Sequence, residues 1–96
     1  MGLAFQPTYG QGITVSPSST SATSELGFTN ETMVFTNLGN VICYIRVGPS
    51  NITADAHDYP ILPGSQVSIG KDQDDTHVAY YSPGSGSLHI ISGIGL

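Results

Sequence analysis

Apolar and polar residues alternate over short stretches of the chain, which predicts β-strands. The clearest stretch is 41–47, where every second residue from Val41 to Val47 is apolar and Arg46 falls on the other face. Shorter alternating runs lie at residues 32–37, 66–69, 76–81 and 87–91. No window shows the i, i+3, i+4 apolar spacing of a helix over three turns. The pattern therefore predicts an all-β fold of short strands.

Glycine, proline and asparagine separate these runs and predict the turns between them. Residues 37–40 (Asn-Leu-Gly-Asn) favour a tight turn that joins 32–37 and 41–47 as an antiparallel hairpin. Pro63-Gly64 predicts a type II turn. Pro60 has no N–H group, so a strand that contains it must lie at a sheet edge or begin there. Many short strands with such turns indicate a small antiparallel β-sandwich or a jelly-roll-like barrel.

The first part of the chain has a different composition. Residues 1–24 are rich in Gly, Pro, Ser and Thr, which predicts an extended N-terminal arm ahead of a β-sandwich domain at 25–96. The arm is either a frayed terminus or a segment that orders against a neighbouring subunit. In the second case its apolar contacts would come from Leu3, Phe5, Ile13 and Val15.

Charge is scarce in this sequence. Of its 96 residues only 9% are charged, with Lys+Arg 2, Asp+Glu 7 and a formal net charge of -5, whereas about 25% is usual for globular domains. Two basic residues do not neutralise a phosphate backbone, so we expect no nucleic-acid partner. No stretch approaches the roughly 20 apolar residues of a membrane span. A surface of uncharged polar side chains is typical of an exported or assembled structural protein.

Residue types that carry chemistry are few and widely spaced. Cys43 is the single cysteine and falls on the predicted core face, where a thiol is usually inert. The three histidines are His57, His77 and His89, too far apart for a short zinc motif, although His77 and His89 fall on outward faces of strands that could pair. The acidic loop at 72–75 lacks the pattern of an EF-hand. We therefore predict no enzyme, and no catalytic, metal or cofactor-binding residue.

Tyrosines and an arginine supply the candidate contact residues. Aromatic side chains and arginine are enriched at protein interfaces, so we predict that an interface includes Tyr44, Arg46, Tyr59 and Tyr81. The alternatives are half-buried sheet residues or a sugar-stacking platform that also uses Tyr80.

The order of turn and strand residues also carries a resemblance. In order, these are Asn37-x-Gly39, Val41 to Gly48, Asp58-x-Pro60-Ile61-Leu62-Pro63-Gly64-Ser65, His77-Val78-Ala79, Gly84 to Ile90 and Gly93-x-Gly95. Over about residues 32–95 this order resembles the small β-sandwich virion proteins of tailed bacteriophages that are called decoration or cement proteins.

The resemblance implies a structural virion protein that bridges major capsid proteins and so stabilises the phage head. It also implies a homo-oligomer, a dimer or trimer, on the capsid surface, assembled in the bacterial cytoplasm without a cofactor. The alternatives are a tail, head–tail junction or fibre component, and a small carbohydrate-binding sandwich.

Overall fold

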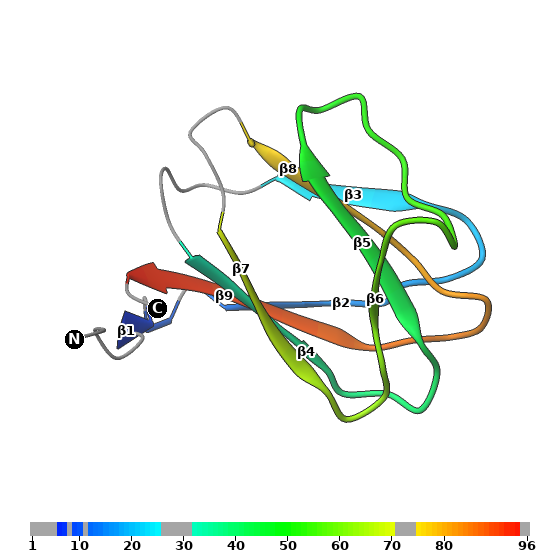
Figure 1. The fold of residues 1–96 in the computed structure, drawn as a ribbon, viewed down its shortest axis with the longest axis horizontal. Coiled ribbons are helices and arrows are strands. Elements are labelled where there is room, and N and C mark those ends of the chain that lie inside the picture. The colour runs from blue at the N-terminus through cyan, green and yellow to red at the C-terminus, as the bar shows by residue number, and fades with distance from the viewer. Residues whose placement is uncertain (1–5, 8, 11, 26–31, 71–74, 95–96) are drawn as a thin grey trace.

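The computed structural model describes residues 6–7, 9–10, 12–25, 32–70 and 75–94. Its strands are β1 (Gln6–Pro7), β2 (Ile13–Val15), β3 (Ala22–Glu25), β4 (Thr32–Asn37), β5 (Cys43–Gly48), β6 (Tyr59–Ile61), β7 (Gln66–Gly70), β8 (His77–Tyr81) and β9 (Leu88–Ile94) (Figure 1). This part of the chain contains no helix long and apolar enough to cross a membrane.

The strands form two antiparallel sheets that pack face to face. In one, here called the β9 sheet, the order is β1-β9-β4-β7, and β2 pairs with β9 beside β1. In the other, the β8 sheet, the order is β3-β8-β5-β6. Consecutive strands mostly alternate between the sheets, which is jelly-roll-like connectivity. The predicted all-β antiparallel sandwich is therefore confirmed.

The core lies between the sheets and follows the predicted alternation. Cys43 and Ile45 of β5 and Leu88 and Ile90 of β9 point inward and are buried, as the sequence predicts. The buried cluster consists of Met33, Phe35, Ile45, Ile61, Val78, Tyr80, Leu88 and Ile90. Burial of alternate residues on both sheets explains why the chain folds as two layers.

The hairpin predicted between 32–37 and 41–47 is wrong. β4 pairs with β7 and β9, whereas β5 pairs with β6 and β8, so the connection crosses from one sheet to the other. Asn37 sets this crossing: its Nδ2 donates to the carbonyl oxygens of Val41 (2.8 Å) and Ile61 (2.9 Å). Its Oδ1 accepts from the Gly39 amide at 3.0 Å. The turn residues signal a change of direction but do not determine which strand becomes the neighbour.

The described part of residues 1–24 belongs to the sandwich. β2 pairs with β9, and β3, which ends at Glu25, pairs with β8. The segment between them is hydrogen-bonded to the connection between β8 and β9. Pro17 O accepts from the Gly86 amide and Ser18 O from the Ser82 amide, both at 2.9 Å. These residues thus form edge strands of both sheets rather than a separate arm, and the sandwich extends across the expected boundary at residue 24. Residues 1–5 lie outside the described part.

Two local predictions are confirmed. Pro60 lies in β6, at the edge of the β8 sheet. Residues 62–65 form the expected turn, with Gly64 at φ 77° and the Ser65 amide donating to Leu62 O at 2.9 Å.

Candidate interaction surface

The outer face of the β9 sheet carries no lysine, arginine, aspartate or glutamate among its described residues. We define this face by the outward-pointing residues Thr14, Thr32, Val34, Thr36, Gln66, Ser68, Gly70, His89, Ile91 and Gly93. It spans strands from both ends and the middle of the sequence. A surface of this kind can approach another protein without stripping water from charged groups, which is the costly step in docking.

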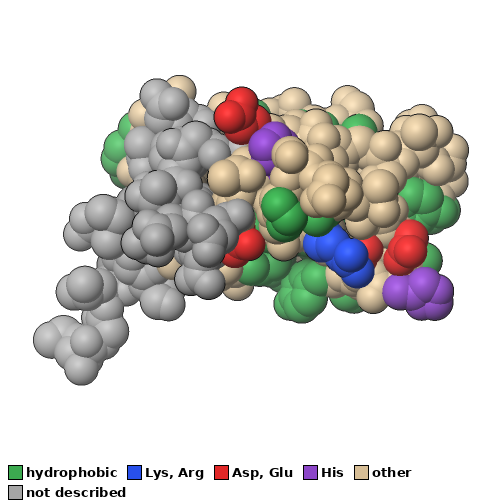
Figure 2. Space-filling model, turned by 90° about the horizontal axis from the view of Figure 1, so that it is seen from above, with side chains coloured by type: hydrophobic (Ala, Val, Ile, Leu, Met, Phe, Trp, Pro, Cys, Tyr) green, Lys and Arg blue, Asp and Glu red, His purple; other side chains and the backbone are tan. Residues whose placement is uncertain are grey.

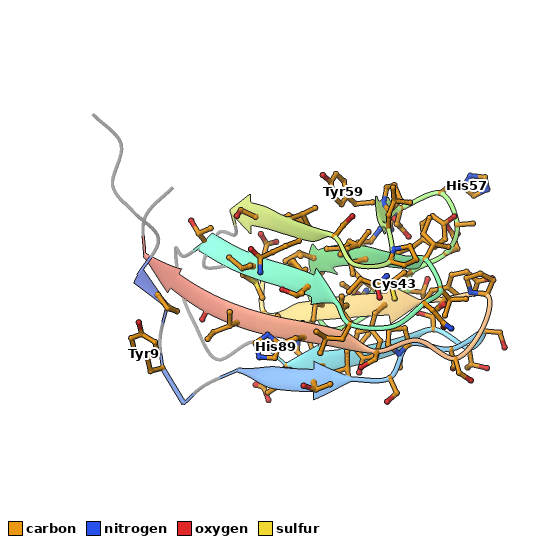
Figure 3. All side chains as sticks on the ribbon, turned by 90° about the horizontal axis from the view of Figure 1, so that it is seen from below. Tyr9, Cys43, His57, Tyr59 and His89 are labelled. Atoms are coloured by element: carbon orange, nitrogen blue, oxygen red, sulfur yellow. The ribbon has the colours of Figure 1, made fainter. Side chains whose placement is uncertain are left out.

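A cross-strand row of polar side chains runs across this face. Thr14, His89, Thr36 and Gln66 lie opposite one another on β2, β9, β4 and β7. Gln66 Nε2 donates to Thr36 Oγ1 at 2.9 Å. The His89 ring lies over Gly12, where a Cβ atom would meet Nε2 at 2.7 Å; Figure 3 shows the ring beside β2. Beside the row, Val34 is only 7% exposed. The face thus offers hydroxyl, amide and imidazole groups for hydrogen bonding.

The outer face of the β8 sheet is different because charged groups lie there. Arg46 Nε contacts Asp58 Oδ1 at 2.8 Å, and Asp58 Oδ2 accepts from the Asp55 amide at 2.9 Å. Acidic, basic and histidine side chains are all visible on the surface shown in Figure 2. Since the Arg46 side chain is 55% exposed, its ion pair contributes no more than about 1 kcal/mol to stability.

The loop at residues 49–58 packs over part of this charged face. A Cβ atom on Gly48 would meet the Ile52 side chain at 3.1 Å, and the Ala54 amide donates to Ser21 Oγ at 2.8 Å. The loop therefore occupies area that a docking partner would otherwise use.

The tyrosines of the predicted interface point in different directions. Tyr44 and Tyr81 form an outward pair on the β8 sheet, with ring centroids 6.1 Å apart, next to Arg46 on the same face. Tyr59 is 52% exposed at the edge of the sandwich, as Figure 3 shows. Tyr80 points into the core, where its hydroxyl lies 2.8 Å from Ser24 Oγ. The tyrosines therefore do not share one stacking platform.

The other predicted contact residues lie elsewhere. Ile13 and Val15 sit on edge strand β2 of the β9 sheet; Val15 packs against the core, and Ile13 is 39% exposed. Leu3 and Phe5 lie outside the described residues. The structure thus separates the predicted set into the β2 edge, the outer face of the β8 sheet and the Tyr59 edge, and contact through any of them stays a prediction.

The candidate chemical groups do not assemble. Cys43 is buried, and desolvation raises the pKa of its thiol, which keeps it in the protonated form. The suggested pairing of the strands that carry His77 and His89 is wrong, because β8 and β9 belong to different sheets. Within the described ranges, no three His, Cys, Asp or Glu side chains lie close enough to hold a metal ion. Residues 72–74 of the acidic loop lie outside those ranges.

An open groove at one edge of the sandwich was not predicted. It has a volume of about 450 Å³ and lies between β5 and β7; its lining includes Ile45, Val47, Tyr59 and Ile69. Sequence periodicity gives no sign of it, because its lining comes from strands that are far apart in the sequence and belong to different sheets. No family model matches the chain, and no curated protein matches it.

Proposed function

We propose that the protein is a structural virion protein, a decoration protein that docks on the capsid of a tailed bacteriophage through the outer face of the β9 sheet. The observation that carries the proposal is that this face, built from β2, β9, β4 and β7, is free of formally charged carboxylate, lysine and arginine side chains in its described part. The resemblance of residues 32–95 to decoration proteins supports the same assignment.

The proposed role is mechanical rather than catalytic. A protein that binds the assembled shell but not its separated subunits stabilises the shell by mass action. Many equivalent sites on a symmetric lattice multiply a modest contribution per copy. The partner is the major capsid protein, and the site of action is the outside of the virion.

Distribution of charge supports the choice of face. The formal net charge is -5, and the exposed residues Glu25 and Asp55 lie on the side of the β8 sheet. Docking through the β9 sheet leaves these groups in water, where they keep the decorated particles apart.

The test is binding to purified capsid shells that lack the protein, measured by co-sedimentation and by the temperature at which the shells break. The wild-type chain should bind and raise that temperature. Thr36→Glu places a carboxylate in the centre of the proposed face and should weaken binding at least tenfold. Thr53→Glu introduces the same charge on the exposed loop over the other sheet and should bind like the wild type.

Two outcomes would contradict the proposal: no binding by the wild type, or equal binding by the two variants when both unfold at the wild-type temperature. Copy number separates a shell protein from a tail, head–tail junction or fibre component, since a lattice carries hundreds of copies and a single vertex only a few. Glycan binding that depends on Tyr44 and Tyr81 would instead favour a carbohydrate-binding function.

A further inference from the structure

Edge strand β7 differs from the other sheet edges. The β1/β2 edge is split into two short strands around Gly10 (φ 80°) and includes Pro7. Edge strand β6 has three residues and contains Pro60, and β3 ends in the charged Glu25. Prolines, breaks and charges of this kind block pairing with another chain. β7, Gln66–Gly70, has five residues and none of these features.

Hydrogen bonding to β4 fixes which groups of β7 face outward. The Asn37 amide donates to Ser65 O at 2.9 Å, at the end of the β4–β7 register. Hydrogen-bonded pairs alternate along antiparallel strands, so Val67 and Ile69 direct their backbone groups toward β4. The N–H and C=O groups of Gln66, Ser68 and Gly70 then point to the other side, where no strand lies in the described structure.

We propose that a second copy of this chain pairs its β7 antiparallel with this edge, about a two-fold axis at Ser68. In this register Ser68 lies opposite Ser68 of the second copy, and Gln66 lies opposite Gly70. Each of these pairs exchanges both of its N–H···O bonds, so every outward backbone group of the strand is satisfied. A register centred on Val67 or Ile69 leaves some of these groups unpaired.

Side chains at the edge suit self-pairing. The residue at a two-fold axis meets its own copy, and Ser68 is small and uncharged. Val67 and Ile69 lie on the inner side and meet each other across the axis, on the side where the groove with Tyr59 opens. The strand itself carries no charge, so no like-charged side chains of β7 lie opposite each other across the axis. In Figure 3, β7 forms one edge of its sheet and β2 the opposite edge.

The test measures the association of the full chain by analytical ultracentrifugation from micromolar to millimolar concentration. The wild type should form dimers. Ser68→Pro removes an outward N–H group that β4 does not use, and Ser68→Lys places two like charges on the axis; each should weaken the dimer at least tenfold. Thr14→Lys is the matched control, because it adds the same charge to the same face at the opposite edge of the sheet. It should change dimerisation less than about twofold.

Hydrogen exchange provides a second readout that does not depend on the variants. The amides of Gln66, Ser68 and Gly70 should become protected as the concentration rises, whereas those of Val67 and Ile69 stay protected throughout. A wild-type chain that remains monomeric, a dimer weakened by Thr14→Lys but not by the Ser68 variants, or a dimer with those three amides unprotected would overturn the proposal. None of these outcomes depends on whether the protein binds a capsid.

Discussion

Among the residues of the turn at 37–40, Asn37 should be the one whose replacement destabilises the fold most. Asn37 is 1% exposed and bonds to three backbone groups: the Gly39 amide and the Val41 carbonyl in its own turn, and the carbonyl of Ile61 in β6. Asn37→Ala removes all of these bonds at once. Its own backbone bonds, from the Asn37 amide to Ser65 O and from the Gly64 amide to Asn37 O, remain.

The magnitude follows from the burial of each lost bond. The bond to Ile61 O is buried and the other two are partly buried. A buried backbone group left without a partner costs about 1–3 kcal/mol, and a partly exposed bond contributes about 0.5–1.5 kcal/mol. We therefore expect Asn37→Ala to lower the free energy of unfolding by about 3 kcal/mol. This is a large part of the roughly 5–15 kcal/mol that stabilises a domain.

Asn37→Asp tests the two hydrogen bonds that Nδ2 donates, to the carbonyl oxygens of Val41 and Ile61. The aspartate has nearly the same shape and keeps an acceptor for the Gly39 amide, but it replaces the Nδ2 donor with an oxygen that faces two carbonyl oxygens. We expect a loss at least as large as that of Asn37→Ala. A smaller loss would mean that the carbonyls of Val41 and Ile61 are satisfied in another way.

Urea unfolding followed by far-UV circular dichroism measures both variants. With a slope of about 1.5 kcal/mol/M, a loss of 3 kcal/mol lowers the midpoint by about 2 M. Asn40→Ala is the control, since Asn40 is exposed in the same turn and should change stability by less than about 0.5 kcal/mol. If Asn37→Ala and Asn40→Ala had equal midpoints, the buried hydrogen bonds would not be what stabilises the crossing between the sheets.

Two further predictions concern buried polar groups. Ser92 is 1% exposed, and its hydroxyl has no hydrogen-bond partner in the described structure, so Ser92→Ala should raise the free energy of unfolding by about 1 kcal/mol in the same urea experiment; a loss of stability would contradict this. Burial raises the pKa of the Cys43 thiol, so the unfolded chain releases its proton first as the pH rises. Stability should therefore fall above about pH 8.5, and the fall should be smaller in Cys43→Ala, as measured by urea midpoints at several pH values.

Local features of this fold could be predicted because local physics determines them. The inward stripe of Cys43 and Ile45 follows from the two-residue period of a strand, whichever strand lies beside it. Pro60 at an edge follows from its missing N–H group, and the turn at Pro63-Gly64 follows from the backbone preferences of those two residues.

Strand partnership could not be predicted in the same way. The alternation in 32–37 and 41–47 is equally consistent with a hairpin and with a crossing between sheets. The crossing depends on contacts that are distant in sequence, such as Asn37 Nδ2 to Ile61 O and the Leu38 amide to Ser87 O at 2.9 Å. β3 was missed for a related reason, because a short polar strand is stable only beside its partner.

The candidate surface depends on the same distant pairings. Thr14, Thr36, Gln66 and His89 come from four separate strands, and nothing in the neighbourhood of any one of them marks it as part of a single face. The sequence shows that charged residues are few. Which of the two outer faces carries them can be determined only from the register of the strands.

Both proposals together predict how dimerisation affects docking. A two-fold axis perpendicular to the β9 sheet at Ser68 keeps the outer faces of the two copies on the same side, so a dimer presents both to one shell. A second contact that forms within an already bound dimer benefits from a high effective concentration. Ser68→Pro should therefore weaken shell binding by about tenfold or more at low protein concentration, although at the docking face it only replaces one small uncharged side chain with another. At high concentration the monomeric variant should fill the shells to the wild-type level. If the variant were monomeric and still bound shells with the wild-type concentration dependence, pairing through β7 would play no part in docking.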